Sequence, residues 1–234
     1  MYKILKFDRG RNCLRYLIQH FNIKELYLPY YLCDVIRHML FEIGCKPIFY
    51  HIDDEFMPVI DFPEDAYILY PNYFGICTTN SEKLAKIYPN LIVDNAHAYY
   101  EEPIGFASFN SGVKFGYGEN AYLWMKDNSA VQNDISPTIN EEWQKKSRNR
   151  FWKLHKTYSG RNMLDIETIR NEQLNRKTFC PFCYPLLCKS ETEADTIVKN
   201  LEEDGYTIYR YWNSLPKSFS EYKFYSRLVP IPII

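Results

Sequence analysis

Apolar and polar positions alternate with two different periods along the first half of the chain. Short apolar runs that end in Pro, Gly or polar residues predict strands, and apolar residues that recur every three or four positions predict helices. The predicted strands are 25–29, 46–52, 66–70 and 91–93, and the predicted helices are 10–22, 31–43 and 81–87. Gly44 directly follows the second helix and fits its C-terminal cap.

Strands and helices that alternate with short connections predict an α/β fold. We expect a three-layer α/β/α arrangement around a mainly parallel sheet. In such sheets, ligands bind beyond the carboxyl ends of the strands. The residues that follow the strands are therefore the candidates for a site: Tyr30 and Tyr31, Asn72 and Tyr73, Asp94 and His97, and 108–114.

The second half has a different pattern. Residues 140–156 are strongly charged with interspersed aromatic residues and predict a helix, and residues 165–176 predict a second, polar one. A β-α-β unit is then expected, with strands at 182–188 and 206–211 around a helix at 191–203, while the apolar tail should pack as an extended segment. We expect three parts: a large domain at 1–126, a helical connection at 127–160 and a small α+β domain at 161–234.

The helix of that unit has clear signals at both ends. Ser190 and Glu193 form a capping-box pattern at its start, and Gly205 follows its end. These signals make its bounds the most sharply defined in the chain.

Composition narrows the classes of function. The 234 residues carry a net charge of −1 and 46% hydrophobic residues, which favours a folded domain and gives no basic surface for nucleic acid. The N-terminal residues lack the apolar core of a signal peptide, and no uncharged run is long enough to cross a bilayer. Together with an odd number of scattered cysteines, these features lead us to expect a cytoplasmic protein that binds neither nucleic acid nor membrane.

Cys180 and Cys183 have the C-x-x-C spacing of redox and zinc sites. No second pair or nearby His completes a zinc site in the sequence. The surrounding run, FCPFCYPLLC, also fits a buried strand in which Cys acts as a small apolar residue. We favour the strand.

The stretch from Leu91 to Leu123 carries the candidate chemistry. It contains an apolar strand that ends at Asp94, then His97, a second short strand, a Ser-rich turn and Lys114. A carboxylate and an amine at the ends of adjacent strands are what a pyridoxal phosphate site needs, because the carboxylate keeps the ring nitrogen protonated and the amine bonds to the cofactor. Taken singly, each residue has a structural alternative: a cap for Asp94, a core position for His97, a surface amine for Lys114.

A second candidate element lies at the start of the first helix. Gly10, Arg11 and Asn12 form a Gly-containing turn whose free amide groups can bind a phosphate. Most helix starts are merely capped or solvated, so this turn supports a phosphate site only together with other motifs.

Several motifs together resemble the DegT/DnrJ/EryC1/StrS family of sugar aminotransferases, which are fold-type-I pyridoxal-phosphate enzymes. In that family, a D-x-A-[HQ]-[AS] motif precedes S-F-x(3–4)-K and a Gly-rich turn into the next strand. The corresponding residues here are 94–98, Ser108-Phe109 with Lys114, and 118–121, preceded by the similar blocks 10–14, 28–31 and 44–53. The similarity extends over residues 8–126, and more loosely from 164 onwards.

The resemblance implies a role for each candidate residue. Lys114 would form the internal aldimine and shuttle protons, Asp94 would pair with the pyridinium nitrogen, and His97 would lie near the phenolic oxygen of the cofactor. Ser108, Ser111 and the amides around Gly10, Arg11 and Asn12 would hold the phosphate, and Tyr31 would stack on the ring. Each of these roles is what the family implies for the matching position.

The resemblance also implies an activity. The protein would transfer an amino group from an amino acid, with glutamate the expected donor, to a keto sugar on a nucleotide, as a homodimer that shares its sites between subunits. Family members usually exceed 300 residues, and this chain is shorter, mainly between Trp124 and Asp165 and at its end. The alternative hypothesis is therefore a shortened, catalytically reduced relative that serves as a binding or assembly protein. Retention of Lys114 favours the enzyme.

Overall fold

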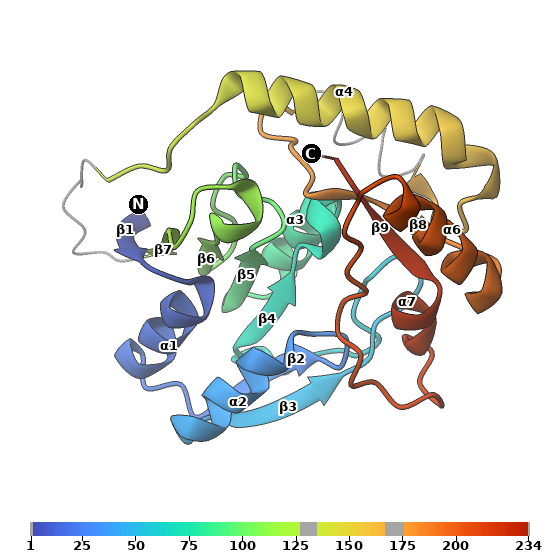
Figure 1. Cartoon of the computed structure of the whole chain (residues 1–234). Coiled ribbons are helices and arrows are strands. Elements are labelled where there is room, and N and C mark those ends of the chain that lie inside the picture. The colour runs from blue at the N-terminus through green and yellow to red at the C-terminus, as the bar shows by residue number, and fades with distance from the viewer. Residues whose placement is uncertain (1, 127–134, 167–175, 234) are drawn as a thin grey trace.

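A seven-stranded sheet forms the centre of the computed structural model, which describes residues 2–126, 135–166 and 176–233 (Figure 1). The strands lie in the order β1-β7-β6-β5-β4-β2-β3. Their bounds are Tyr2–Phe7 (β1), Glu25–Pro29 (β2), Lys46–Tyr50 (β3), Ile68–Pro71 (β4), Leu91–Asn95 (β5), Ala107–Asn110 (β6) and Ala121–Lys126 (β7). Strands β2 to β6 pair in parallel, and β7 and β1 run antiparallel to their neighbours.

The helices and remaining strands complete the chain. Their bounds are Gly10–His20 (α1), Asp34–Glu42 (α2), Thr78–Ile87 (α3), Glu141–Tyr158 (α4), Glu191–Glu203 (α6) and Tyr222–Ser226 (α7), with 3-10 turns at Tyr73–Gly75 (η1), Val113–Phe115 (η2) and Ser159–Arg161 (η3). Cys183–Leu187 (β8) and Leu228–Pro232 (β9) form a separate antiparallel pair. None of the described helices is both long and apolar enough to cross a bilayer.

Alternate residues of the central strands pack on opposite faces of the sheet, as the twofold period of a strand requires. Leu69 and Ile92 join a buried cluster with α1 and α2, whereas Ile68 and Val93 join a second cluster with α3 and the C-terminal elements. The sheet is thus covered on both faces. This confirms the predicted α/β architecture with a mainly parallel sheet.

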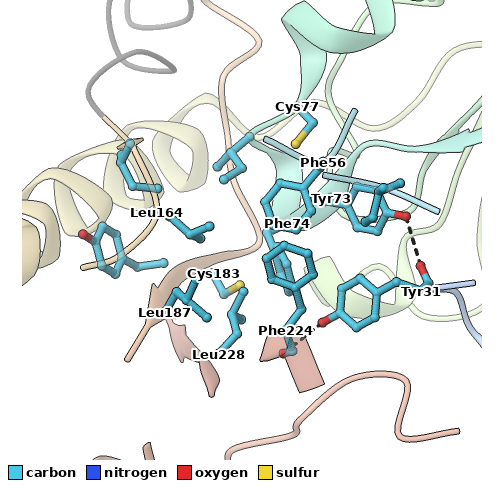
Figure 2. Close-up of a cluster of buried hydrophobic side chains, with 14 of the residues drawn as sticks. Tyr31, Phe56, Tyr73, Phe74, Cys77, Leu164, Cys183, Leu187, Phe224 and Leu228 are labelled. Atoms are coloured by element: carbon cyan, nitrogen blue, oxygen red, sulfur yellow. Dashed lines mark hydrogen bonds between the residues drawn. The ribbon is translucent and has the colours of Figure 1, made fainter. Parts of the chain in front are cut away.

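The second cluster connects the sheet to the C-terminal half of the chain. Tyr31 and Tyr73 from the sheet side pack with Phe224, and the β8–β9 pair contributes Cys183 and Leu228 (Figure 2). Two hydrogen bonds to backbone carbonyls link these residues: the Tyr73 hydroxyl donates to the Tyr31 carbonyl at 3.0 Å, and the Tyr31 hydroxyl donates to the Phe224 carbonyl at 3.3 Å. The division into parts at 126 and 160 stays a prediction, and this core extends across it.

Most predicted elements of the first half are present with small shifts in their bounds. The second helix begins at Asp34, three residues later than expected, because residues 30–32 form a bend between β2 and α2. Gly44 has a φ of +69° after α2, in agreement with its predicted capping position. Strand β1, which was not predicted, closes the sheet next to β7.

The expected β-α-β unit is wrong in its second strand. Strand β8 and helix α6 lie where predicted, and the Ser190 hydroxyl caps α6 by accepting a hydrogen bond from the Glu193 amide at 3.1 Å. Residues 206–211 are irregular, however, and β9 of the apolar tail pairs with β8 instead. The predicted helix at 140–156 is α4, whereas the helix predicted at 165–176 falls mostly outside the described residues.

The second half of the run that contains the C-x-x-C spacing is the buried strand β8, as favoured from the sequence, whereas Cys180 precedes that strand. Cys183 and Cys188 are almost fully buried, and burial raises the pKa of the Cys188 thiol to about 11 and that of the Cys180 thiol to about 12. These thiols therefore stay protonated at neutral pH.

Candidate active site

Asp94, His97 and Lys114 line one cavity of about 180 Å³. The cavity lies at the carboxyl ends of the parallel strands, where the α/β pattern predicts a ligand site. The sheet places the three residues there because Asp94 is near the end of β5, His97 follows that strand, and Lys114 lies in η2, in the connection from β6 to β7. The remaining lining residues are Leu32, Cys33, Pro71, Asn72, Ala96, Tyr211 and Trp212.

The Asp94 carboxyl group is held by its own turn. Its Oδ1 accepts a hydrogen bond from the Ala96 amide at 2.8 Å. Burial raises the pKa of the Asp94 carboxyl group to about 6, and the Ala96 amide and the Lys114 ammonium group oppose that shift only in part. A cationic group in the cavity would stabilise the charged form of this buried carboxyl group.

His97 is a buried imidazole packed between aromatic side chains. Its Nδ1 accepts a hydrogen bond from the Phe74 amide at 3.2 Å, so in the neutral ring Nε2 carries the proton. The rings of Phe182 and Trp212 stack on it at centroid distances of 4.9 and 5.6 Å. Burial, with a further contribution from the charge of Lys114, holds the pKa of His97 well below its usual value. His97 is therefore a neutral hydrogen-bond donor in a fixed orientation.

Lys114 is an exposed amine in an ordered turn. The amide of Gly112, the residue before η2, donates to the Asn120 carbonyl at 2.6 Å, and Gly116 ends the turn with a φ of +76°. The Lys114 Nζ lies 6.0 Å from the centroid of the Phe182 ring. Its charge acts on both Asp94 and His97, which places the amine near both groups.

The start of α1 lies beside the end of β6 rather than in the lining of the cavity. A Cβ on Gly10 would meet the Asn110 carbonyl oxygen at 3.2 Å, so a glycine lets the helix approach this strand closely. Arg11 is exposed, and the Asn12 side chain donates to Asp8 at 2.7 Å. Arg9, which precedes the helix, has an extended backbone and forms an ion pair with Glu119.

Two of the residues expected to contact the cofactor, Ser108 and Tyr31, form hydrogen bonds in the core instead. The Ser108 hydroxyl is fully buried in β6, where it donates to the Ile104 carbonyl at 2.7 Å and accepts from the Ile104 amide at 2.9 Å. Tyr31 is fully buried in the core shown in Figure 2, and its hydroxyl is bonded to Phe224. Neither residue lines the cavity, and Ser111, which is partly buried, does not line it either.

Tyr211 and Trp212 are site residues that sequence reasoning missed. They belong to the irregular segment that replaces the predicted strand at 206–211, and they reach the cavity from the C-terminal half of the chain. The only signal in the sequence is a pair of aromatic residues in a polar neighbourhood. That signal does not show which cavity the rings contact.

Asn72, a candidate from its position after a strand, has a side chain that is hydrogen-bonded within the framework of the site. Its Nδ2 donates to Thr78 at 2.9 Å and to Asn95 at 3.1 Å, and its Oδ1 accepts from the Cys77 amide at 2.9 Å. This network joins the ends of β4 and β5 to the start of α3. Asn72 therefore fixes the spacing of the strands that carry Asp94.

No protein-family model matches the sequence, and a search of curated proteins gave no match either. Solved structures do match over 98% of the chain. One is PseC of Helicobacter pylori, described as an aminotransferase involved in the biosynthesis of pseudoaminic acid, with 14% identity, a TM-score of 0.66 and 81% of that chain covered. Another is the PLP-form of Spr1654 from Streptococcus pneumoniae, a sugar aminotransferase by its description, with 12% identity, a TM-score of 0.67 and 81% covered.

A third match carries the family name reached from the sequence motifs. It is a DegT DnrJ EryC1 StrS aminotransferase from Brucella abortus, with 13% identity, a TM-score of 0.63 and 81% of that chain covered. The chain has the fold of these aminotransferases. At this level of identity the match establishes the architecture alone.

Proposed function

We propose that this chain is a pyridoxal-phosphate-dependent aminotransferase that acts on a keto sugar. One observation carries the proposal: the carboxylate of Asp94, the imidazole of His97 and the amine of Lys114 line a single cavity at the carboxyl ends of the parallel strands. The fold shared with known aminotransferases and the order of the motifs support it. We further propose that the amino acceptor is a keto sugar linked to a nucleotide and that the amino donor is glutamate.

The chemistry of the cavity fits the ring of the cofactor. A protonated pyridine nitrogen would give the buried Asp94 carboxylate the cationic partner that burial favours. The Nε2–H of His97 would donate to the phenolic oxygen, and Lys114 would supply the amine that bonds covalently to the aldehyde. When bound, the cofactor supplies an electron sink that makes a proton next to the amino group acidic.

The residues of the chain would then act as follows. Asp94 would hold the ring nitrogen in its charged form, and neutral His97 would orient the ring without adding a second positive charge. The Lys114 amine would move a proton at the reacting carbon of the substrate. The exposure of Lys114 in its turn leaves the amine free to move between these tasks.

We assign the phosphate to the start of α1 together with Ser111. The amides of Gly10 and Arg11 lie in the first turn of that helix, where an anion is favoured, whereas the Asn12 amide already donates to the Arg9 carbonyl at 3.0 Å. Burial raises the pKa of the thiol of the next residue, Cys13, and the charge of Asp94 adds to that shift, which places Cys13 near Asp94. Ser108 and Tyr31 are left out of the assignment because their hydroxyl groups are engaged in the core.

The proposal includes a cytoplasmic homodimer. The seven cysteines all lie in the described residues as free thiols, which suits a reducing compartment. Phe41 and Ile139 are large apolar side chains that are 88% and 67% exposed, and a subunit contact would cover surfaces of this kind. Light scattering on the purified protein tests the dimer, because a monomer at micromolar concentration contradicts it.

The test of the proposed function is covalent uptake of the cofactor. Purified protein is incubated with pyridoxal phosphate, reduced with borohydride and digested, and the modified lysine is identified by mass spectrometry. Lys114 should carry the adduct, and the visible absorbance band should disappear on reduction. Lys114→Ala should lose both signals, whereas Lys86→Ala, which removes another exposed lysine from α3, should keep them.

The outcome also separates the two hypotheses. A protein that neither takes up pyridoxal phosphate nor transfers an amino group from glutamate is the reduced relative rather than the enzyme. If the cofactor binds, half-reactions with glutamate and then with a panel of nucleotide-linked keto sugars identify the substrates.

A further inference from the structure

The segment 176–182, which precedes β8, docks on the turn that follows β5. At one end of the contact, the Phe182 ring stacks on His97 with 4.9 Å between the centroids. At the other end, the Thr178 hydroxyl donates to Glu101 Oε2 at 3.1 Å. The two contact residues are four positions apart on each stretch, so the segment lies alongside the turn in the opposite direction. Glu101 does not line the cofactor cavity and has no role in the mechanism above.

Glu101 is a buried carboxyl group with an unsatisfied oxygen. Only 5% of the residue is exposed, and Oε1 has no hydrogen-bond partner among the described residues. The Glu101 amide donates to the Ala98 carbonyl at 3.0 Å, which closes the turn and fixes the carboxyl group at the junction with Thr178. Burial without full hydrogen bonding penalises the carboxylate much more than the neutral acid.

Charged groups approach this carboxyl group from both sides of the junction. Arg176 of the segment pairs with Glu82 of α3 at 2.5 Å. Burial raises the pKa of Glu101 to about 7, against an ordinary value of 4.5, with the charge of Glu82 as a minor contribution. The charge of Arg176 and the hydroxyl groups of Thr178 and Thr78 oppose that shift only in part. Glu101 therefore exchanges its proton close to neutral pH.

Helix α4 holds the segment from another side through contacts that do not titrate near neutral pH. The Ser147 hydroxyl donates to the Pro181 carbonyl at 3.1 Å. Burial raises the pKa of the Cys180 thiol to about 12, the charge of Glu101 adds to the shift, and the charge of Arg148 opposes it. Cys180 thus stays a neutral thiol, and Glu101 supplies the pH dependence of the junction.

We propose that Glu101 is a positioning residue whose protonation state sets how firmly the segment 176–182 docks on the turn after β5, and thereby how firmly Phe182 holds the imidazole of His97. The neutral acid favours docking, and the carboxylate weakens it. The effect on docking is independent of the cofactor, whereas its consequence for cofactor binding rests on the proposed function.

The direction of the pH effect follows from the two protonation equilibria. When the segment is docked, Glu101 keeps its proton up to about pH 7, whereas an undocked, solvated carboxyl group releases it near pH 4.5. Between these values the docked state binds more protons than the undocked state. Docking therefore weakens as pH rises through this range and stays weak above it.

Labelling of Cys180 measures docking without cofactor. Cys180 is 3% exposed, so its thiol reacts when the segment opens, and Cys188 at the end of β8 is a buried reference in the same tryptic peptide. Cofactor-free protein is treated with methyl methanethiosulfonate from pH 5 to pH 8, and mass spectrometry of the fragments locates the label. The labelling rate of Cys180 relative to Cys188 should rise by at least about tenfold between pH 5 and pH 7.5 and then level off.

Two variants assign this rise to one carboxyl group. Glu101→Gln keeps the size of the side chain and stays neutral, so its relative labelling rate should be low and constant across the pH range. Glu102→Gln removes the neighbouring exposed carboxylate and should behave as wild type. A wild-type ratio that is independent of pH, or the same rise in Glu101→Gln, would overturn the inference.

The affinity for pyridoxal phosphate tests the consequence for His97. The Kd of wild type divided by that of Glu101→Gln should rise by at least about threefold between pH 5.5 and pH 7.5, because a weaker docked state lowers the fraction of competent protein. In a Phe182→Leu background this quotient should stay constant, since the ring that connects docking to His97 is missing. A constant quotient with Phe182 present rejects the positioning role. Protein that binds no pyridoxal phosphate at any pH fails the proposed function instead, and the Cys180 labelling still decides whether Glu101 controls docking.

Discussion

The indole ring of Trp212 lies parallel to the imidazole of His97, with an angle of 4° between the planes and 5.6 Å between the centroids. Trp212 has a φ of +61°, a backbone conformation that is uncommon for a large residue. Tyr31 packs edge-on against the same indole at 4.5 Å. Tyr31, the ring-stacking residue expected from the sequence, thus contacts the site through Trp212.

We predict that Trp212→Leu weakens cofactor binding while the fold is retained. Leucine keeps an apolar contact but offers no ring to hold the imidazole plane, and aromatic pairs contribute about 0.5–1.5 kcal/mol. The Kd for pyridoxal phosphate should therefore rise by about twofold to tenfold, as measured by absorbance titration. Trp152→Leu, a half-buried tryptophan of α4, is the control, and an equal Kd in both variants would show that Trp212 has no positioning role.

Asp94→Asn should stabilise the protein without cofactor at neutral pH. The native carboxyl group has a pKa of about 6 against an ordinary value of 3.8, so between these values the native state binds the proton more strongly than the unfolded state. The charged form therefore destabilises the native state above about pH 6, and this penalty disappears as pH falls below about 4. Because the site is partly open to solvent, we expect a gain of about 1–2 kcal/mol at pH 8.

Urea unfolding of both proteins from pH 4 to pH 8 provides the measurement. The difference in unfolding free energy should be near zero at the acidic end and grow through pH 6. The same variant should bind pyridoxal phosphate much more weakly, because it lacks the charge that holds the ring nitrogen protonated. A constant difference across the range contradicts the assigned burial of the charge.

The parts of the structure that follow local rules could be predicted from the sequence. Helix α6 has its predicted bounds because Ser190 caps its start and Gly205, with a φ of +88°, follows its end. Asp94 and His97 reach one cavity because both are close to the end of a single strand, and the return from β6 to β7 brings Lys114 to them. The caps of α6 and the placement of Asp94, His97 and Lys114 each depend on residues that are close together along the chain.

The parts that depend on distant contacts could not be predicted. Strand β9 pairs with β8 through the register of Pro230 opposite Pro185, where neither residue has an amide proton to donate. The two prolines of the tail predict an extended segment, and the sequence pattern predicts the second strand at 206–211 instead. Trp212 belongs to this irregular stretch and reaches the site through a contact that no local pattern indicates, the stacking of its ring on His97.

Gly75→Ala should be among the most damaging single substitutions in the site. Gly75 has a φ of +75°, and an added Cβ would lie 2.3 Å from the carbonyl oxygen of His97. The chain must move at His97 to relieve that contact, with a cost of about 2–4 kcal/mol in addition to the backbone strain. Chemical denaturation measures the loss of unfolding free energy.

Gly116 offers a matched control for this prediction. Its φ is +76°, and no heavy atom lies within 4 Å of an added Cβ. Gly116→Ala therefore carries the backbone penalty alone, about 1 kcal/mol. If both variants lose the same stability, the close approach of Gly75 to His97 has no energetic consequence.

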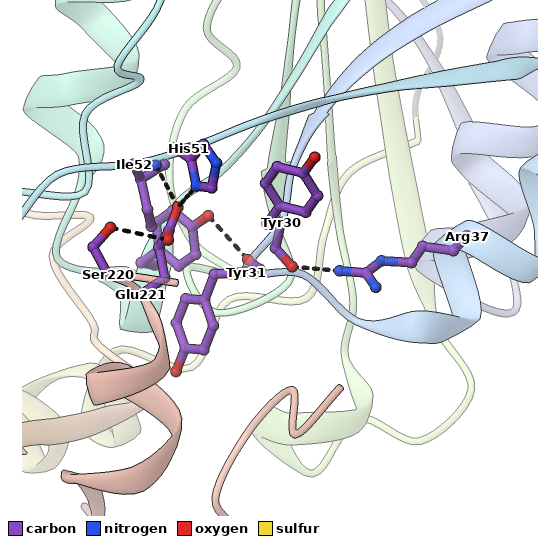
Figure 3. Close-up of polar contacts among 8 residues, drawn as sticks. Tyr30, Tyr31, Arg37, His51, Ile52, Ser220 and Glu221 are labelled. Carbon is purple, nitrogen blue, oxygen red and sulfur yellow. Dashed lines mark hydrogen bonds and ion pairs between the residues drawn. The ribbon is translucent and has the colours of Figure 1, made fainter. Parts of the chain in front are cut away.

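Glu221 is a fully buried carboxylate that ties the C-terminal segment to the end of β3 (Figure 3). It accepts hydrogen bonds from the Ile52 amide at 2.9 Å and from the Ser220 hydroxyl at 3.1 Å, and it pairs with His51 Nδ1 at 2.9 Å. Glu221→Gln keeps the size of the side chain but removes the charge that these donors share. We predict a loss of about 1–3 kcal/mol in unfolding free energy, because hydrogen bonds to a charged group exceed neutral ones.

His51→Ala separates the contribution of the ion pair from that of the other contacts of Glu221. The His51 side chain is 47% exposed, so its pair with Glu221 is screened by solvent and the variant should lose less than about 1 kcal/mol. The double variant should lose about as much as Glu221→Gln alone, since the histidine acts through the carboxylate. Additive losses in urea unfolding would show instead that His51 stabilises the chain through its ring contact with Tyr30 at 4.7 Å.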